Sequence, residues 1–295
     1  MLAWLRLLRI SALPSAISNI LLGYLIVHNS WMPWQPLALL ILASSCLYLA
    51  GMVFNDVFDH QRDLEQRPNR PIPSGSISLS AATFAYTALM GVAAVCGLFL
   101  GWRSLLVIAG IIVCVFLYNA VFKASVFGPI FMGSCRVLNI VLGGSVLPDG
   151  IPAAPQLLWW VALSVGILIT GLTLFAKYET RNNSRHWLIG SSAVIVAGIT
   201  MLASTGWACF PEAKSHFIKF ACLVGLICVP ALIRIIAAIS KPEPKLIQGA
   251  VIALLRSLIL LDAAVCFLVA PVVYCIVVMA LLFPAMFLSR VIPPT

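Results

Sequence analysis

The chain has 295 residues, of which 62% are hydrophobic and 9% are charged, and its formal net charge is +9. Soluble domains contain about 45–50% apolar and about 25% charged residues, so both values point toward an apolar environment. This composition excludes a soluble enzyme, a disordered chain and a soluble nucleic-acid-binding protein. We therefore expect a protein that lies in a lipid bilayer and has no nucleic-acid partner.

Apolar stretches recur along the chain, and most have the length of about 17–25 residues that a membrane-spanning helix requires. Stretches such as Leu157–Ala176 lack the alternation of apolar and polar residues that marks membrane β-barrels. Backbone that faces lipid must be hydrogen-bonded internally, so these stretches must be helices. We predict an all-α membrane bundle of about nine transmembrane helices, in a single domain over residues 1–295. The predicted helices cover approximately 10–28, 37–55, 80–100, 104–121, 128–147, 157–177, 187–205, 216–236 and 247–268.

One further apolar stretch, about 271–288, contains two prolines and is either another crossing or a helix along the membrane.

The orientation in the membrane follows from the positions of Lys and Arg, because cytoplasmic loops carry an excess of them. We therefore predict a multi-pass protein of a bacterial-type inner membrane with a cytoplasmic N-terminus. With this orientation, the inner segments carry Arg6, Arg9, Arg62, Arg67, Arg70, Lys123, Lys177, Arg181, Arg185, Lys241 and Lys245. The outer segments carry Arg103 and Lys214, with Lys219 at the boundary.

The longest polar stretch, residues 55–79, follows the second predicted helix on the inner side. It begins with NDVFDHQRD, which places Asn55, Asp59 and Asp63 four residues apart. On a helix this spacing aligns the three side chains on one face, about 6 Å apart along the axis. Mg²⁺ takes oxygen ligands and commonly binds one or two carboxylates together with substrate phosphates. The alternative interpretation is a solvated helix end, where acidic residues are common.

The next residues, 67–75, read RPNRPIPSG. Proline cannot continue a helix, so the three prolines predict that the acidic helix ends near Arg67. Arg67 and Arg70 would then lie on a stiff turn beside the carboxylates, and guanidinium groups suit phosphate oxygens. Carboxylates for a metal and arginines for phosphate together indicate a diphosphate site.

The stretch from Asn55 to Gly75 resembles the first signature of the UbiA superfamily of intramembrane prenyltransferases, N-x-x-x-D-x-x-x-D followed by an arginine-proline run ending in S-G. The resemblance implies helices around a central cavity that opens toward the membrane. It also implies transfer of an isoprenyl group from an isoprenyl diphosphate to a hydrophobic acceptor, with Mg²⁺ as cofactor. The matching residues are Asn55, Asp59, Asp63, Arg67, Pro68, Arg70, Pro71, Ser74 and Gly75.

The inner loop after the fourth predicted helix contains Tyr118, Asn119 and Lys123. The resemblance implies that a tyrosine and a basic residue of this loop lie near the diphosphate, which assigns Tyr118 and Lys123 to that place. Without the resemblance, Lys123 would be equally well explained as a charge that faces the inner side of the membrane.

Arg136 lies inside the fifth predicted helix, with Asn139 three residues further on. A cation at the centre of a membrane helix costs about 2.5–3.5 kcal/mol on insertion scales, so Arg136 should face the cavity and have a partner. A diphosphate or an acid of the motif would serve, and the alternative is snorkelling or pairing with Asp262. Asp262 is itself an ionisable group at membrane depth, either part of a site or packed against Arg256 or a helix-end carbonyl.

The family pattern after the sixth helix is a tyrosine followed by D-x-x-x-D, and this chain departs from it. The matching residues are Tyr178, Glu179 and Asn183. Glutamate can bind Mg²⁺, whereas asparagine offers one neutral carbonyl oxygen, so we expect a weaker second metal site. The strings TLFAKYE, GPIFMGSCRVLN and LLRSLILLDA look like those of one bacterial subgroup, the UbiA-like EboC membrane proteins.

The resemblance thus implies a Mg²⁺-dependent prenyltransferase that ionises an allylic diphosphate and transfers its isoprenyl group to an unidentified acceptor. Two alternatives remain open, a non-catalytic carrier of an isoprenoid or related precursor and a small transporter with broken helices. We expect Asp59, Asp63, Lys123 and Tyr178 to be catalytic, and Asn55, Asp59, Asp63 and Glu179 to bind Mg²⁺. We expect substrate contacts from Asn55, Arg67, Arg70, Tyr118, Arg136, Asn139, Glu179 and Asn183.

Overall fold

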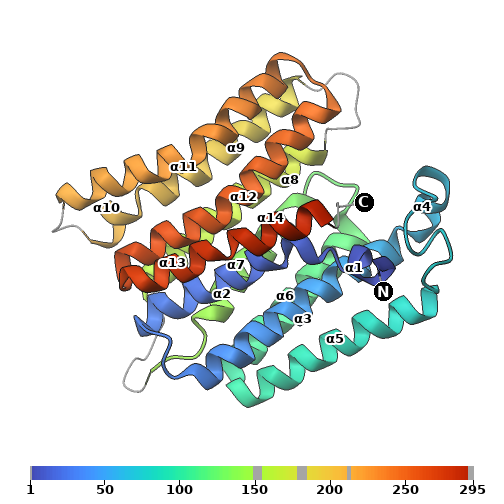
Figure 1. Ribbon diagram of the computed structural model, residues 1–295, viewed down its shortest axis with the longest axis horizontal. Helices are drawn as coiled ribbons and strands as arrows, with labels where there is room; N and C mark the ends of the chain where they lie inside the picture. Colours follow the sequence, from blue (N-terminus) through green and yellow to red (C-terminus); the bar gives the residue numbers. More distant parts are fainter. Residues whose placement is uncertain (1, 149–154, 178–184, 211–213, 292–295) are drawn as a thin grey trace.

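The computed structural model describes residues 2–148, 155–177, 185–210 and 214–291. All regular secondary structure in these ranges is helical, as the composition predicts. Figure 1 shows the long helices packed side by side in an elongated bundle, with the short helix α4 at one end.

The helices follow one another with mostly short connections. The first half of the chain forms α1 (Leu2–Leu7), η1 (Ile10–Ala12), α2 (Leu13–His28), α3 (Trp34–Phe58), α4 (His60–Gln66), α5 (Leu79–Leu100), α6 (Trp102–Phe116), the π-helical turn η2 (Leu117–Phe122) and α7 (Gly128–Gly143). The second half forms α8 (Gln156–Lys177), α9 (Arg185–Ala203), α10 (Thr205–Cys209), α11 (Lys214–Ser240), α12 (Pro244–Val269), α13 (Val272–Ala280) and α14 (Leu282–Val291).

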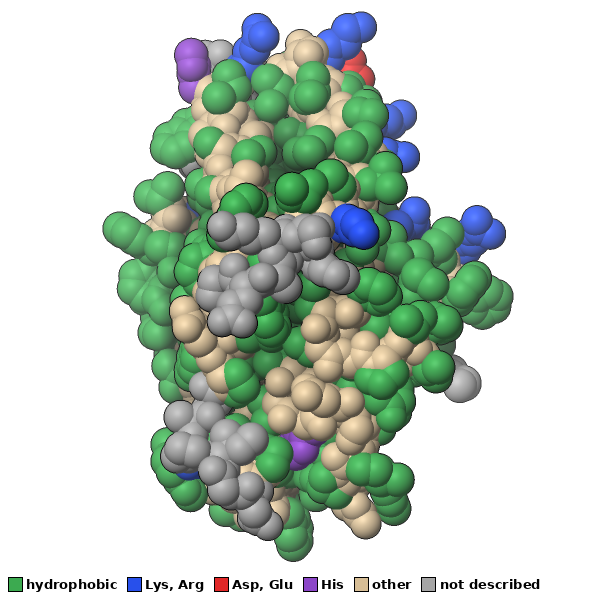
Figure 2. Space-filling model, turned by 90° about the vertical axis from the view of Figure 1, so that its left-hand side faces the viewer, with side chains coloured by type: hydrophobic (Ala, Val, Ile, Leu, Met, Phe, Trp, Pro, Cys, Tyr) green, Lys and Arg blue, Asp and Glu red, His purple; other side chains and the backbone are tan. Residues whose placement is uncertain are grey.

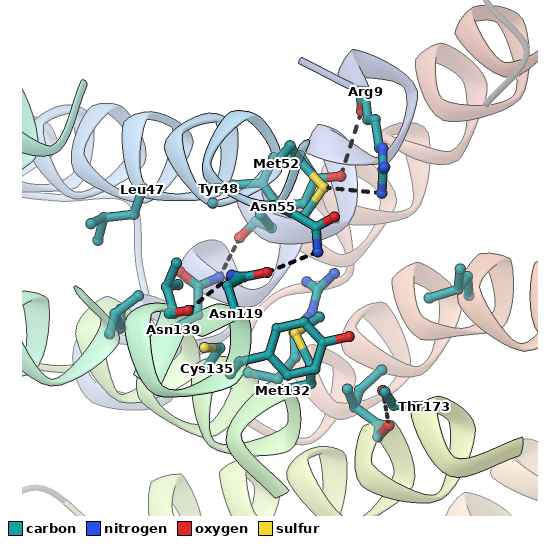
Figure 3. Close-up of a pocket in the computed structure, with 18 of the residues that line it drawn as sticks. Arg9, Leu47, Tyr48, Met52, Asn55, Asn119, Met132, Cys135, Asn139 and Thr173 are labelled. Atoms are coloured by element: carbon teal, nitrogen blue, oxygen red, sulfur yellow. Dashed lines mark hydrogen bonds between the residues drawn. The ribbon is translucent and has the colours of Figure 1, made fainter. Parts of the chain in front are cut away.

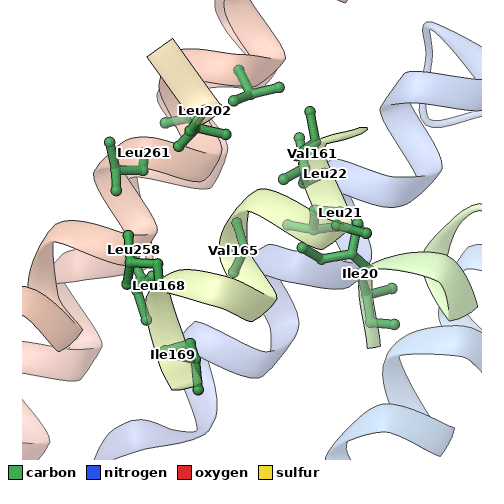
Figure 4. Packing of buried hydrophobic residues seen from close by; sticks show 14 of the residues in the cluster. Ile20, Leu21, Leu22, Val161, Val165, Leu168, Ile169, Leu202, Leu258 and Leu261 are labelled. Atoms are coloured by element: carbon green, nitrogen blue, oxygen red, sulfur yellow. The ribbon is translucent and has the colours of Figure 1, made fainter. Parts of the chain in front are cut away.

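The centre of the main hydrophobic core lies where α8 packs beside α2, α7 and α12. Figure 4 shows Val161, Val165 and Leu168 of α8 among buried side chains of α2 and α12, including Leu22 and Leu258. All five side chains are almost completely buried. Because lipid tails are as apolar as leucine, this core is stabilised by close van der Waals packing rather than by removal from water.

Glycines allow α7 to approach its neighbours closely. A Cβ atom on Gly23 of α2 would lie 2.1 Å from the carbonyl oxygen of Ile140, and one on Gly143 of α7 would lie 2.4 Å from that of Ile20. Small residues at such crossings let two backbones meet, which strengthens packing in a membrane. The crossing joins the middle of α2 to the last turn of α7, and next to it Arg136 bonds to Ser15 and Asn19.

Within the described residues, nine helical segments are long and apolar enough to cross a membrane. They include every predicted helix except 128–147, because α7 ends at Gly143 after 16 residues, and at 1.5 Å per residue such a helix is about 24 Å long. The apolar stretch after α12 is helical as well, and α13 and α14 together form the ninth candidate span, 272–291. In the structure, one predicted crossing is thus shorter than expected, and the last stretch has the length of a full one.

Large apolar side chains cover much of the outer surface. Phe84, Phe99, Leu226 and Phe283 are each at least 70% exposed, and Figure 2 shows a face dominated by hydrophobic side chains, with Lys and Arg gathered toward its upper and right-hand parts. An apolar surface of this extent is suited to lipid and not to water. Together with the candidate spans, it identifies an integral, multi-pass membrane protein.

Candidate functional site

The N-x-x-x-D-x-x-x-D motif lies where α3 meets α4. α3 ends just before Asp59 and α4 begins just after it, so the predicted acidic helix is interrupted at this residue. Backbone hydrogen bonds nevertheless continue in steps of four, from Asp59 N–H to the carbonyl of Asn55 (3.0 Å) and from Asp63 N–H to that of Asp59 (2.8 Å). α4 ends one residue before Arg67, as the prolines predict.

Asp59 is buried and accepts hydrogen bonds from two cations. Lys123 Nζ lies 2.5 Å from Asp59 Oδ2, and Arg62 Nη2 lies 3.0 Å from the same oxygen. Burial lowers the pKa of Lys123 below its ordinary value, and the hydrogen bond and charge of Asp59 oppose this shift. The structure therefore places Lys123 beside the first motif, although the two residues are 64 positions apart.

Arg70 bridges two buried carboxylates. Its Nη1 lies 2.6 Å from Asp63 Oδ2 and 3.5 Å from Asp56 Oδ1. Asp56 also accepts a 2.8 Å hydrogen bond from Arg9, which belongs to the segment between α1 and η1. The sequence did not place Arg9 or Asp56 in the candidate site, because neither belongs to the motif. Asp56 could have been found as an acidic residue directly after Asn55, on the last turn of an apolar helix.

Arg67 and Arg70 share the proline-rich turn but lie in different environments. Arg70 is buried, whereas Arg67 is exposed. The turn folds back through a 2.9 Å hydrogen bond from Ser74 N–H to the carbonyl of Arg70. It closes at Gly75, whose φ of +73° is a left-handed conformation that glycine adopts without a Cβ penalty. The S-G pair at the end of the motif thus closes the turn that holds Arg70 against the carboxylates.

A cavity of about 410 Å³ lies next to the motif, between α2, α3, α6, α7, α8 and α12 (Figure 3). Asn55 is both the first motif residue and part of the cavity wall, and its Nδ2 donates to Asn119 Oδ1 at 2.9 Å. Most of the other lining side chains are apolar. Those with nitrogen or oxygen atoms are Arg9, Ser44, Tyr48, Asn55, Tyr118, Asn119, Arg136, Asn139 and Thr173.

The π-helical turn η2 brings two consecutive residues, Tyr118 and Asn119, to the cavity wall. A π turn is wider than an α turn, and such turns occur frequently at functional sites. Asn119 Nδ2 donates to the carbonyl of Val115 at 2.9 Å, so both ends of its amide are used. The tyrosine assigned from the resemblance therefore lines the same cavity as Asn55.

Arg136 lines the cavity and is held by α2. Its Nη1 donates to the carbonyl of Ser15 (3.0 Å) and to Asn19 Oδ1 (2.9 Å), and its Nη2 donates to Ser15 Oγ (2.9 Å). Asn19 Nδ2 in turn donates to Asp262 Oδ2 at 2.8 Å. Asp262, the alternative partner of Arg136, is therefore reached through an amide instead of directly. Asp262 accepts from Ser18 and Asn19, whereas Arg256 donates to Ser289 Oγ at 3.4 Å.

Asn139, one turn after Arg136 on α7, also lines the cavity. Its Oδ1 accepts a 2.7 Å hydrogen bond from Ser44 of α3, and its Nδ2 donates to the carbonyl of Ala16 of α2 at 2.9 Å. Asn139 thus connects three helices at the cavity wall.

The second acidic motif begins directly after α8. Lys177, the last residue of α8, donates from Nζ to the carbonyl oxygens of residues 124 and 125 at 2.9 and 2.6 Å. The chain therefore enters the second motif next to the loop that carries Lys123. The residues assigned to this motif, Tyr178, Glu179 and Asn183, lie outside the described residues.

In the described part of the chain, no three or more His, Cys, Asp and Glu side chains form a group that could hold a metal ion. The predicted Mg²⁺ site differs from such a group, because it combines Asp59 and Asp63 with the carboxamide of Asn55 and with Glu179. Its oxygen-only donor set is of the kind that Mg²⁺ prefers.

Residues 16–248, most of the chain, match the UbiA prenyltransferase family. The chain belongs to this family. The matched range contains the first motif and most of the cavity wall, whereas Arg9 and Asp262 lie outside it.

Among relatives of this UbiA-family protein is the digeranylgeranylglyceryl phosphate synthase of Metallosphaera sedula, 24% identical over 247 residues. That alignment covers 78% of this chain and 82% of the relative. The enzyme of the same name from Methanothermobacter thermautotrophicus is 37% identical over 101 residues, which are 34% of this chain and 36% of the relative. The higher identity is thus limited to about a third of each protein.

The fold is similar to that in a structure described as giving insights into digeranylgeranylglyceryl phosphate synthase in membranes, with a TM-score of 0.63, 17% identity and coverage of 94% of this chain and 98% of that one. A UbiA homologue from Archaeoglobus fulgidus bound to GPP and Mg²⁺ has a TM-score of 0.62 at 14% identity, covering 94% and 99%. These likenesses establish the fold.

Proposed function

We propose that this protein is a Mg²⁺-dependent prenyltransferase that moves an isoprenyl group from an isoprenyl diphosphate to an unidentified aromatic or lipid acceptor. The observation that carries the proposal is that the acidic motif and its cations adjoin a largely apolar cavity, with Asn55 belonging to both. The charged motif would bind the diphosphate, and the apolar cavity would bind the isoprenyl chain. The relatives named as synthases, and the neighbour bound to GPP and Mg²⁺, support the same chemistry.

The first motif fits a hard cation. Asn55 binds Asn119 through its amide nitrogen, which directs its carbonyl oxygen elsewhere, and Lys123 and Arg62 both use Oδ2 of Asp59. Asp63, and Glu179 from the second motif, would supply the remaining protein ligands. Bound Mg²⁺ would neutralise the charge that develops on the diphosphate leaving group.

The cations near the motif would stabilise the same leaving group. Lys123 and Arg70 contact the carboxylates of the motif. Arg67 is exposed on the proline-rich turn that carries Arg70, and Arg136 lies on the cavity wall. Charge-assisted hydrogen bonds are strong where water is excluded, so they lower the barrier as the allylic C–O bond breaks.

The cavity would receive the isoprenoid chain and the acceptor. Its wall is mostly apolar, and Asn139 connects the helices that form it. Tyr118 on the wall, together with Tyr178, would face the allyl cation and shield it from water. The acceptor then attacks the cation and loses a proton.

We further infer that residues 1–295 form one domain whose acidic motifs face the cytoplasm. The packing of α12 and α14 against α2 supports a single unit, and the distribution of Lys and Arg supports the orientation. The three strings shared with the EboC subgroup support placing the protein in that branch of the family, with the bilayer as its environment.

The test is release of pyrophosphate by purified protein in detergent with Mg²⁺, labelled geranyl, farnesyl and geranylgeranyl diphosphates, and a bacterial lipid extract. Release that disappears in Asp59→Asn and Asp63→Asn would support an enzyme. Glu65→Gln is the matched control, because Glu65 is exposed on the same helix α4. If the protein binds a donor in the presence of Mg²⁺ but releases no pyrophosphate from any of them, the carrier would be supported instead. The altered residues Glu179 and Asn183 would then explain the missing turnover.

A further inference from the structure

A chain of buried polar contacts leads from the cavity through α2 into α12. Arg136 donates to Asn19 Oδ1 at 2.9 Å, and Asn19 Nδ2 donates to Asp262 Oδ2 at 2.8 Å. Ser18 Oγ donates to the same carboxylate oxygen at 2.5 Å. We refer to Arg136, Asn19 and Asp262 as the relay.

Asp262 is placed where it cannot touch a molecule in the cavity. It is absent from the cavity wall, and Asp262 and Asn19 are each 1% exposed. Its second oxygen, Oδ1, is buried and has no hydrogen-bond partner among the described residues. A carboxylate at membrane depth is expensive and typically belongs to functional sites. Asp262 can therefore affect a molecule in the cavity only through the residues that it contacts.

The chemistry of the three groups gives the relay one direction. A guanidinium can only donate hydrogen bonds, an ionised carboxylate can only accept them, and an amide has one end of each kind. Arg136 and Asp262 together therefore fix the amide of Asn19, with its oxygen toward the guanidinium and its NH₂ group toward the carboxylate. If residue 262 could also donate, only Arg136 would still hold the amide in this orientation.

The relay also keeps the charge of Arg136 available. Lys123 is in direct contact with the carboxylate of Asp59, whereas an amide separates Arg136 from Asp262. The carboxylate compensates the buried cation from a distance, and it leaves the guanidinium beside the cavity without a directly bound anion in the described residues.

We propose that Asp262 is a positioning residue that, through Asn19, holds the Arg136 guanidinium in place to bind an anionic group in the cavity. This proposal rests on the proposed function in one respect, because it takes the anionic group to be the diphosphate of the donor. Its residues are distinct from the acidic motif, so the two proposals can be tested separately.

The first experiment is a double-mutant cycle read by binding. The probe is farnesyl thiolodiphosphate, an analogue that ionises poorly, titrated with Mg²⁺ into purified protein in detergent. We expect Arg136→Gln and Asp262→Asn each to raise the Kd about tenfold, and the double variant to bind no more weakly than Arg136→Gln. Ser257→Ala is the control, because this buried hydroxyl on α12 donates to the carbonyls of Ala253 and Ile227, neither of which belongs to the relay, and should leave the Kd unchanged.

The second experiment moves the carboxylate along the relay. Asn19→Asp alone sets two carboxylates against one guanidinium, and we expect it to lower both affinity and Tm. Combining it with Asp262→Asn restores one carboxylate and one amide in exchanged order. We expect this double variant to recover Tm but to bind the probe about tenfold more weakly than the wild type, because the carboxylate at position 19 would lie directly against the guanidinium. A purely structural role for Asp262 would instead let the affinity recover together with Tm.

Two results would overturn the relay. One is a double variant Arg136→Gln, Asp262→Asn whose increase in Kd equals the product of the two single increases, and the other is an exchanged pair that binds the probe as tightly as the wild type. A wild-type protein that binds no probe and releases no pyrophosphate would contradict the proposed function instead. In that case the relay is judged by Tm, which Asn19→Asp should lower and the exchanged pair should restore. Failure of that recovery would overturn the relay itself.

Discussion

The acidic motif and the cavity interior bind their cations in different ways. At the motif, Lys123 and Arg70 contact the carboxylates of Asp59 and Asp63 directly, at 2.5 and 2.6 Å. In the interior, Arg136 binds a carbonyl, a hydroxyl and an amide, and is connected to a carboxylate only through that amide.

The difference shows what each region can do with its charge. Direct ion pairs allow several carboxylates to be buried close together, because each has a cation to offset its lost hydration. Indirect pairing satisfies the hydrogen bonds of a cation without an anion at its side. The carboxylates of the motif are therefore suited to bind a metal in place of Lys and Arg, which can then bind a diphosphate. The interior is suited to hold one fixed positive charge.

The largest effect is expected at the motif carboxylates. Asp59→Asn and Asp63→Asn remove charge that would bind Mg²⁺, with little change in shape. We expect each to lower the rate of pyrophosphate release by about 100-fold or more at saturating donor. The measurement is a steady-state rate across a Mg²⁺ titration. A variant that keeps more than about a tenth of the wild-type rate would argue against a role for that carboxylate in catalysis.

The two arginines of the proline-rich turn should differ strongly in their effect on stability. Arg70→Ala leaves Asp56 and Asp63 buried without a shared cation, and we expect it to lower the free energy of unfolding by about 3–5 kcal/mol. Arg67→Ala removes an exposed side chain and should change stability by less than about 0.5 kcal/mol. Thermal denaturation in detergent measures both, and equal shifts would contradict the difference in environment.

A smaller effect is expected at the crossing of α2 and α7, which brings Asn19 to Arg136. In Gly143→Ala the new methyl group would lie 2.4 Å from the carbonyl oxygen of Ile20, so the helices must separate. We expect a loss of about 1–3 kcal/mol in stability, together with weaker binding of the diphosphate probe. Gly91→Ala on α5 is the matched control, because nothing lies within 4 Å of its added Cβ. If both variants unfold at the same temperature, close packing at this crossing is not required.

The smallest effect concerns the second motif. Asn183→Asp restores the carboxylate that the family pattern has at this position, and metal affinity rises with the number of charged ligands. We expect the Mg²⁺ concentration that gives half-maximal pyrophosphate release to fall by roughly threefold to tenfold. Asn182→Asp, which adds the same charge one residue earlier, is the control for a simple electrostatic effect. Equal responses to both substitutions would mean that position 183 does not bind the metal.

Local patterns predicted a large part of this architecture. The acidic helix ends where the prolines require it, and Asn55, Asp59 and Asp63 keep their spacing of four because that spacing depends on backbone hydrogen bonds within a few residues. The break at Asp59 was not predictable, since no proline or glycine marks it.

Apolar stretches of spanning length already establish a helical membrane protein, because backbone that faces lipid must form its hydrogen bonds internally. The sequence also gives the order and spacing of the carboxylates and arginines in the motif. Two other pairings follow from tertiary packing alone: Arg9 binds Asp56, 47 positions away, and Asn19 binds Asp262, 243 positions away. Such partners have no local signature, because they are chosen by which helices cross and by how closely glycines let the backbones approach.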